Sequence, residues 1–249
     1  MQDKMLLNRI ALVTGASRGI GRACTVKLAQ EGAVVYAGYR KEGDFDQILE
    51  EASGLSGEII PVCLDVCDKQ SVLNCIKKIK HEKGKLDILV NNAGITRINR
   101  LEMLNDEAID LIYETNVYGT IHVTQTALRL LKKSEYASIV NLSSVLYKNG
   151  DIGQTAYASS KAAVSTMTKV WAQELAPFGI RVNAVAPGST DTDMFNIVDG
   201  ELRQESLDKI GMGRLAQPEE IANVVLFLAS DMASYVTGEV VGASGGWFA

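Results

Sequence analysis

The stretch Ile10-Ala11-Leu12-Val13-Thr14-Gly15-Ala16-Ser17-Arg18-Gly19-Ile20-Gly21 decides how the rest of the chain is interpreted. Its first four residues are apolar at every position, which is typical of a strand buried on both faces. A glycine-rich turn follows and leads into an amphipathic helix pattern over about 19–31, and a second apolar run covers 34–39. The order strand, helix, strand predicts a βαβ unit with two parallel strands.

The same alternation continues to the end of the chain. Further strand-like runs cover 59–64, 86–90, 138–142, 181–186 and 239–242, with helix-length segments between them. The pattern predicts an α/β fold, a Rossmann-type doubly wound parallel sheet of about seven strands with helices on both faces. Because the 249 residues contain no linker-like tract, charge block or internal repeat, we expect a single domain over 1–249.

Composition excludes several classes of function. The net charge of -5 gives no broad positive field, so we expect neither nucleic-acid binding nor attachment to an anionic membrane surface. No apolar run is long enough for a membrane span, and no secretory signal precedes the first strand. We therefore expect a cytoplasmic protein with reduced thiols, and the spacing of its cysteines and histidines predicts no metal site.

The glycine turn is a candidate site for a dinucleotide. Its spacing is GxxxGxG, which differs from both the GxGxxG fingerprint and the phosphate loop that ends in Lys and Ser or Thr. Glycines allow the backbone to approach a pyrophosphate, and the free N–H groups of the following helix favour its negative charge. In a doubly wound sheet, ligands bind outside the carboxyl ends of the strands, where this turn lies.

The end of the second strand indicates which dinucleotide is bound. An NAD enzyme places Asp or Glu there, about 20 residues beyond the glycines, to bind the ribose 2'-hydroxyl. This chain has Tyr39-Arg40-Lys41 instead. Arg40, together with Arg18 in the glycine turn, can pair with a 2'-phosphate, so we expect NADP(H).

The turns after the third and fourth strands add candidate contacts. Asp65-Val66 follows the third strand, and Asn91-Asn92-Ala93-Gly94 follows the fourth. We expect Asp65 to accept a hydrogen bond from the adenine amino group, and Asn92, Ala93 and Gly94 to line the side of the adenosine ribose. Taken alone, the Asn-Asn-Ala-Gly stretch would favour an ordinary turn that ends the strand.

The sequence after the fifth strand carries the chemistry. Asn141-Leu142-Ser143-Ser144 is followed, thirteen residues past Ser144, by Tyr157 and then Lys161. Residues at i and i+4 share one face of a helix. An adjacent ammonium and a cationic nicotinamide both favour phenolate, so we expect them to lower the pKa of Tyr157 and to suit it to general acid/base catalysis.

Taken together, these motifs resemble the short-chain dehydrogenase/reductase family over about 8–246. TGxxxGxG, NNAG, Asn116 within Thr115-Asn116-Val117-Tyr118-Gly119, a serine after the fifth strand, YxxxK and Pro187-Gly188 occur in the family's order. The resemblance implies hydride transfer from NADPH to a carbonyl carbon, with Tyr157 as proton donor and Ser144 bound to the same oxygen. The family spacing favours Ser144 over Ser143.

The resemblance also implies roles for the remaining site residues. Lys161 is expected to bind the nicotinamide ribose, and Asn116 to hold a water that links Lys161 to solvent. Thr190 and Thr192 are expected to contact the nicotinamide carboxamide, and 189–212, with Phe195, Ile197 and Val198, to form a substrate lid. The expected cofactor contacts are Gly15, Ser17, Arg18, Gly19, Ile20, Gly21, Arg40, Asp65, Val66, Asn92, Ala93, Gly94, Tyr157, Lys161, Pro187, Gly188, Thr190 and Thr192.

Within the family, the chain is most similar to bacterial 3-oxoacyl-[acyl-carrier-protein] reductases. The similarity includes Gly213-Arg214-Leu215 and Tyr235-Val236-Thr237-Gly238. It implies a 3-oxoacyl thioester substrate, on acyl-carrier protein or CoA, a role in fatty acid biosynthesis, and a homotetramer that pairs the segments 116–131 and 155–175 and the last strand. Arg129 matches one basic carrier-docking position, but Gln173 occupies the other.

Other functions stay open at this point. A sugar, a steroid or a small ketone is an alternative substrate for the same reaction. A binding protein that senses the cofactor without catalysis is a further alternative, although such a protein would be expected to lose the tyrosine or the lysine, and both are present.

Overall fold

The computed structural model describes residues 4–40, 45–195, 204–205 and 207–247. Its strands are β1 (Ile10–Val13), β2 (Val34–Tyr39), β3 (Glu58–Cys63), β4 (Ile88–Asn91), β5 (Ser138–Leu142), β6 (Arg181–Pro187) and β7 (Val240–Ala243). Its α-helices are α1 (Gly19–Gln30), α2 (Phe45–Glu51), α3 (Lys69–Lys83), α4 (Asp106–Tyr113), α5 (Gly119–Leu131), α6 (Leu146–Asn149), α7 (Thr155–Leu175) and α9 (Pro218–Ala229).

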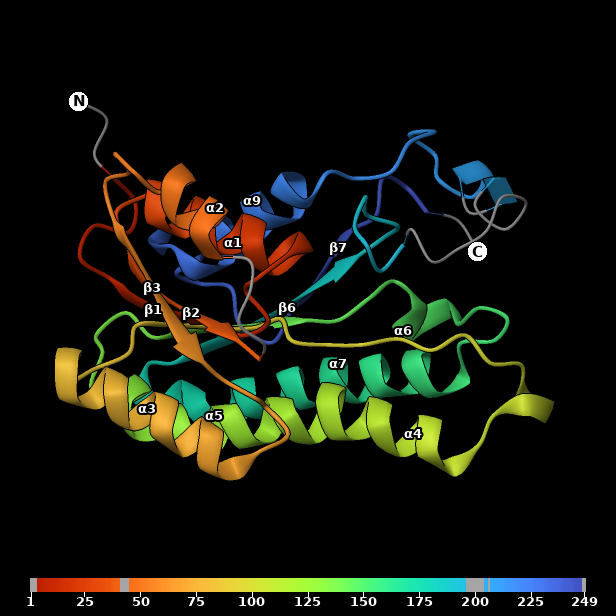
Figure 1. Ribbon diagram of the computed structural model, residues 1–249, viewed down its shortest axis with the longest axis horizontal. Coiled ribbons are helices and arrows are strands. Elements are labelled where there is room, and N and C mark those ends of the chain that lie inside the picture. Colours follow the sequence, from red (N-terminus) through yellow and green to blue (C-terminus); the bar gives the residue numbers. More distant parts are fainter. Residues whose placement is uncertain (1–3, 41–44, 196–203, 206, 248–249) are drawn as a thin grey trace.

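These seven strands form one parallel sheet in the order β3-β2-β1-β4-β5-β6-β7. Helices α1, α2 and α9 cover one face, and α3, α4, α5 and α7 cover the other (Figure 1). The predicted doubly wound sheet of about seven strands is therefore confirmed. The strand order reverses between β1 and β4, which is where such a sheet binds ligands.

Side chains from successive strand residues enter two separate hydrophobic cores. In β1, Ala11 and Val13 pack toward α1 and α9, whereas Ile10 and Leu12 pack toward α3 and α5. This alternation explains why the strand is apolar at every position, because both of its faces are buried. The sheet therefore provides a rigid support for the turns at its carboxyl edge.

The predicted strand bounds differ from the observed ones by one or two residues in β3, β4, β6 and β7. The largest difference is in β4, which begins at Ile88 rather than at residue 86. Asp87 is fully buried just before it, and its Oδ2 accepts a hydrogen bond of 2.8 Å from the backbone N–H of Ile10. The side chain of Asp87 therefore connects the start of β4 to the start of β1 by a hydrogen bond.

One irregular segment lies beside the candidate site. Residues Glu114–Tyr118 form a short π-helix, labelled η2, between α4 and α5. A π-turn widens the helix and is common at functional sites. It contains Asn116, and the sequence pattern did not predict this widening.

No helix among the described residues is both long and apolar enough to span a membrane. The expected lid lies only partly within the described chain. Ile197 and Val198 fall outside it, and the lid and the single-domain assignment stay predictions.

Candidate active site

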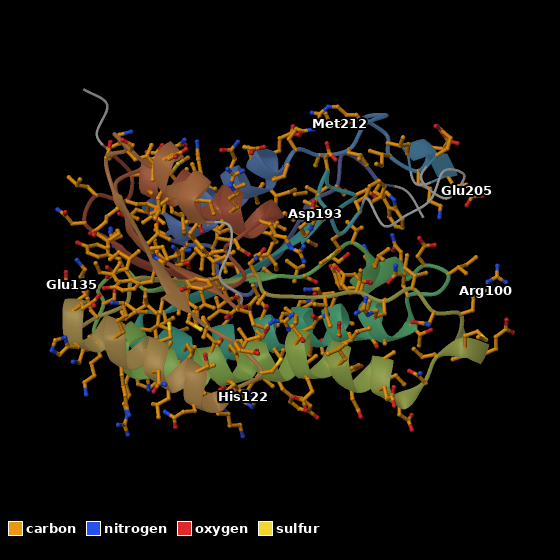
Figure 2. The ribbon with its side chains drawn as sticks, viewed as in Figure 1. Arg100, His122, Glu135, Asp193, Glu205 and Met212 are labelled. Atoms are coloured by element: carbon orange, nitrogen blue, oxygen red, sulfur yellow. The ribbon has the colours of Figure 1, made fainter. Side chains whose placement is uncertain are left out.

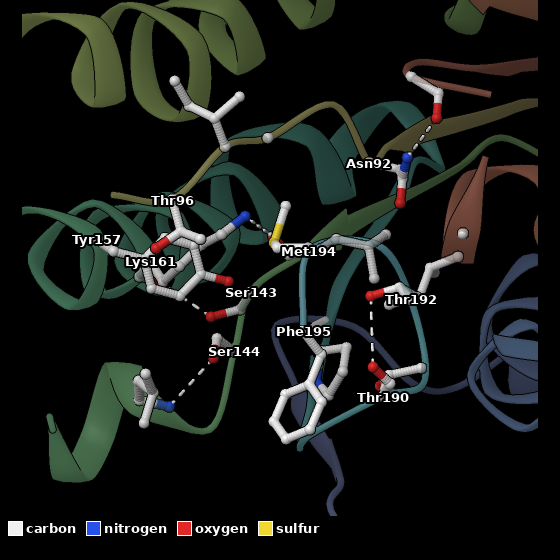
Figure 3. Close-up of a pocket in the computed structure, with 18 of the residues that line it drawn as sticks. Asn92, Thr96, Ser143, Ser144, Tyr157, Lys161, Thr190, Thr192, Met194 and Phe195 are labelled. Atoms are coloured by element: carbon white, nitrogen blue, oxygen red, sulfur yellow. Dashed lines mark hydrogen bonds between the residues drawn. The ribbon is translucent and has the colours of Figure 1, made fainter. Parts of the chain in front are cut away.

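A cavity of about 1150 Å³ opens at the carboxyl edge of the sheet. This volume is ample for a dinucleotide together with a small substrate. All eighteen residues expected to contact the cofactor line this one cavity, as does Ser144. Figure 3 shows Ser144, Tyr157 and Lys161 toward one end of the pocket, with Asn92, Thr190 and Thr192 toward the other.

The glycine turn forms a close-packed cradle at the start of α1. Gly15 and Gly19 have positive φ angles of 62° and 53°, a conformation that favours glycine. At Gly21, a Cβ atom would overlap the carbonyl oxygen of Gly15. Arg18, at the N-cap of α1, makes no side-chain capping hydrogen bond. Arg18 therefore leaves the first N–H groups of α1 uncapped by its own side chain, and free N–H groups at a helix start favour an anion.

The side chain of Asn92, the residue directly after β4, contacts this turn. Its Nδ2 donates hydrogen bonds of 2.9 Å to the carbonyl oxygens of Thr14 and Gly15. The hydroxyl of Thr14 in turn accepts from the backbone N–H groups of Asn92 and Ala93. The amide of Asn92 thus holds the glycine turn in shape, a role that the sequence did not indicate.

The two arginines expected at the 2'-phosphate both line the cavity. Arg18 forms an ion pair of 3.5 Å with Asp193, which follows β6 and lies beside the start of α1 (Figure 2). Arg40 is exposed at the end of β2. Asp65 is engaged through Oδ1 with the backbone N–H of Cys67 at 2.9 Å. The cofactor contacts expected of these residues stay predictions.

Tyr157 and Lys161 lie in the first turns of α7. Lys161 is only 5% exposed, and its Nζ donates a hydrogen bond of 2.8 Å to the carbonyl oxygen of Leu142, at the end of β5. The same Nζ lies 5.7 Å from the centre of the Tyr157 ring. The helix and the strand end therefore bring the ammonium and the phenol together.

Burial changes the proton affinity of both groups. It lowers the pKa of Lys161 to about 8, because an ammonium loses hydration in this position. It raises the pKa of Tyr157, and a hydrogen bond to Ser144 acts in the opposite direction. The expected lowering of the Tyr157 pKa is therefore wrong for the protein by itself, because desolvation of the phenolate is the largest influence.

The structure separates the two candidate serines. The hydroxyl of Ser143 is buried, donates to the carbonyl oxygen of Lys161 at 3.1 Å and lies 2.7 Å from that of Ser165. Ser144 interacts with Tyr157. This geometry supports Ser144 as the partner of Tyr157, and it gives Ser143 a structural contact with α7.

Asn116 lies behind the pocket wall and is 1% exposed. Its Oδ1 accepts from the N–H of Ile95 at 2.9 Å, and its Nδ2 donates to the carbonyl of Ile95 and to Ser160. A Cβ atom on Gly94 would lie 3.3 Å from both Asn116 Oδ1 and Lys161 Nζ, so both atoms flank Gly94. The water-holding role expected of Asn116 stays a prediction.

Two polar residues of the pocket wall are not among the predicted site residues. Thr96 and Gln154 line it and are bonded to each other. Gln154 lies three residues before Tyr157, and this position next to YxxxK was the available signal. The apolar residues on the wall include Ile98, Ile152, Met194, Phe195 and Trp247.

Known proteins match this chain along nearly its whole length. Residues 15–247 match a family model described as enoyl-(acyl carrier protein) reductase. The chain is 46% identical to a 3-oxoacyl-[acyl-carrier-protein] reductase of Thermotoga maritima, over 97% of this chain and 98% of that protein. It is 42% identical to the enzyme of the same name from Vibrio harveyi, over 98% of each chain.

A solved structure agrees with these sequence matches. A short-chain type dehydrogenase/reductase from Mycobacterium marinum superposes with a TM-score of 0.92 at 33% identity, over 98% of this chain and 97% of that one. The chain therefore belongs to the short-chain dehydrogenase/reductase family, which confirms the oxidoreductase class predicted from its motifs.

Proposed function

We propose that the protein uses NADPH to reduce the 3-oxo group of an acyl thioester to an alcohol. The observation that carries the proposal is the pairing of the Ser144 and Tyr157 hydroxyls on the pocket wall, with the Lys161 ammonium behind them. Two hydroxyl donors beside each other suit one carbonyl oxygen.

The residues around the glycine turn fit a dinucleotide. The close contact at Gly21 leaves no room for a side chain, and the start of α1 offers backbone N–H groups to a pyrophosphate. Lys161 and the turn at Pro187-Gly188 would hold the nicotinamide half. When bound, the cofactor supplies the hydride for the carbonyl carbon.

The chain's own residues supply the proton. The phenol of Tyr157, whose pKa burial raises, can donate this proton to the carbonyl oxygen. Ser144 donates a hydrogen bond to the same oxygen as negative charge develops there. The Lys161 ammonium then stabilises the phenolate that remains on Tyr157.

The apolar wall favours an acyl substrate over a sugar. The side chains of Ile98, Ile152 and Met194 are 45%, 78% and 40% exposed beside the cavity, although they are large and apolar. An acyl chain would cover such a surface, whereas a sugar would gain little from it. The relatives named as 3-oxoacyl-[acyl-carrier-protein] reductases support the same substrate class.

The catalytic proposal is tested by replacing Tyr157 with Phe. We expect Tyr157→Phe to reduce kcat by at least about 100-fold, as general acid catalysis contributes that much, while NADPH still binds. NADPH oxidation would be followed with acetoacetyl thioesters of CoA and acyl-carrier protein, and with a 2-enoyl thioester, sugars, steroids and simple ketones. Near-native turnover by Tyr157→Phe would contradict the mechanism, and preference for another panel member would contradict the substrate. Tyr136→Phe, before β5 and outside the pocket, is the matched control.

The choice of NADPH is tested at Arg40. We expect Arg40→Ala to weaken NADPH binding by about 10-fold or more and to leave NADH binding nearly unchanged, because only NADPH carries the 2'-phosphate. Titration of both cofactors by fluorescence measures this. Equal losses for NADPH and NADH would contradict the role of Arg40.

We also propose a homotetramer in the cytoplasm. Large apolar side chains are exposed near α4, α5 and α7, among them Leu111, Tyr118, Val170 and Phe178. Burial of such side chains between copies would be favourable. Sedimentation equilibrium is expected to give four copies, and a monomer would contradict the assembly.

A further inference from the structure

Two polar side chains on the pocket wall have no part in the mechanism above. Thr96 follows β4, and Gln154 comes directly before α7. Both are partly buried and both line the cavity. The hydroxyl of Thr96 donates a hydrogen bond of 3.1 Å to Oε1 of Gln154.

This hydrogen bond engages the oxygen of the Gln154 side-chain amide and leaves its nitrogen available to a ligand. A glutamine amide has one acceptor oxygen and two N–H donors on Nε2. Thr96 occupies the oxygen, and Nε2 makes no hydrogen bond to any residue in the described part of the chain. Gln154 therefore offers N–H donors to whatever enters the pocket.

The position of Gln154 relates this donor to the reacting centre. Gln154 is the N-cap of α7, three residues before Tyr157, and both residues line the cavity. The backbone of Gln154 is held as well, because its carbonyl accepts from the N–H of Ala158 at 2.7 Å. The contact with Thr96 and the position of Gln154 thus place an amide donor on the same cavity wall as Tyr157.

We propose that Gln154, oriented by Thr96, binds the thioester carbonyl oxygen of a 3-oxoacyl substrate and so selects such substrates over simple ketones. The inference rests on the proposed function. A 3-oxoacyl thioester has a second carbonyl separated from the reacting one by a single methylene group. With the 3-oxo oxygen at Tyr157 and Ser144, the second oxygen is an acceptor suited to Nε2. A simple ketone has no group for this donor.

The test compares two substrates in the intact enzyme. We expect Gln154→Leu to lower kcat/KM for an acetoacetyl thioester by about 10-fold, the value of one neutral hydrogen bond. For 2-pentanone, which lacks the second carbonyl, we expect kcat/KM to change less than about 2-fold, since no such hydrogen bond is lost. Melting temperature and NADPH affinity monitor folding, and Gln30→Leu, at the exposed end of α1, is the matched control.

Thr96 is tested as a positioning residue. We expect Thr96→Val to show part of the same selective loss and Thr96→Ser, which keeps the hydroxyl, to restore the thioester rate. Equal losses on both substrates, or an unchanged thioester rate in Gln154→Leu, would overturn the role of Gln154. Wild-type enzyme that reduces ketones but no 3-oxoacyl thioester would instead overturn the proposed function, and the inference with it.

Discussion

In the proposed mechanism Lys161 acts as an ammonium, and the burial of that charge costs stability. The side chain is almost completely buried, and burial lowers its pKa to about 8 from an ordinary value of 10.5. Lys161→Met keeps the length of the side chain and removes the charge. We expect this variant to be inactive and, at pH 7, more stable than the wild type.

The magnitude follows from the two pKa values. A lysine whose pKa is lower in the folded protein than in the unfolded chain makes the folded state less stable. This holds at every pH at which the unfolded chain keeps the lysine protonated. Below pH 8 the cost is about 3 kcal/mol, since a tenfold change in an equilibrium constant is about 1.4 kcal/mol. The lost hydrogen bond to Leu142 offsets about 1 kcal/mol of this. The net expectation at pH 7 is a gain of about 2 kcal/mol in the free energy of unfolding.

The pH dependence has a definite sign. As the pH rises from 8 toward 10.5, the unfolded chain loses the proton that the folded protein has already released, so the cost disappears. Between pH 7 and 9.5 the advantage of Lys161→Met over the wild type should fall by about 2 kcal/mol. Urea unfolding at several pH values and one protein concentration measures this difference, because contributions from other groups cancel between the two proteins.

A stability difference between the two proteins that stays constant from pH 7 to 9.5 would contradict a lowered pKa of Lys161 in the folded state. A variant less stable than the wild type at pH 7 would also contradict it. Lys133→Met, at an exposed position after α5, is the control for replacing lysine by methionine.

Two further predictions concern residues that shape the sheet edge. Gly21→Ala should lower the free energy of unfolding by about 3 kcal/mol and weaken NADPH binding, because its Cβ atom would meet the Gly15 carbonyl. Gly242→Ala, where a Cβ atom meets nothing within 4 Å, is the control in the same urea and NADPH titrations. Similar losses of stability and NADPH affinity in both variants would contradict the role of Gly21 in the close-packed glycine turn. Asp87→Ala should cost about 3 kcal/mol in urea unfolding, because the buried N–H of Ile10 loses its acceptor. A cost below about 1 kcal/mol would mean that this carboxylate is not needed there.

The family and the layout of the sheet could be predicted from the sequence because both depend on local patterns. Residues 10–13 are apolar throughout since the strand is buried on both faces, and the glycines follow because no side chain fits between Gly21 and Gly15. The helical spacing of Tyr157 and Lys161 likewise placed both on one side of α7, and the cavity is lined by both. Each of these features is encoded within a few consecutive residues.

Other features depend on residues far apart in the chain and needed the tertiary structure. The choice between Ser143 and Ser144 depends on which side of β5 faces α7, and the two serines are adjacent in sequence. The direction of the Tyr157 pKa shift depends on how much protein surrounds the phenol, which no spacing reveals. The fold, the family and the helical spacing of Tyr157 and Lys161 could be predicted from the chain alone, because periodicity and short motifs record local geometry. The pairing and desolvation of the polar groups could be seen only in the folded protein, because they are set by contacts between distant segments.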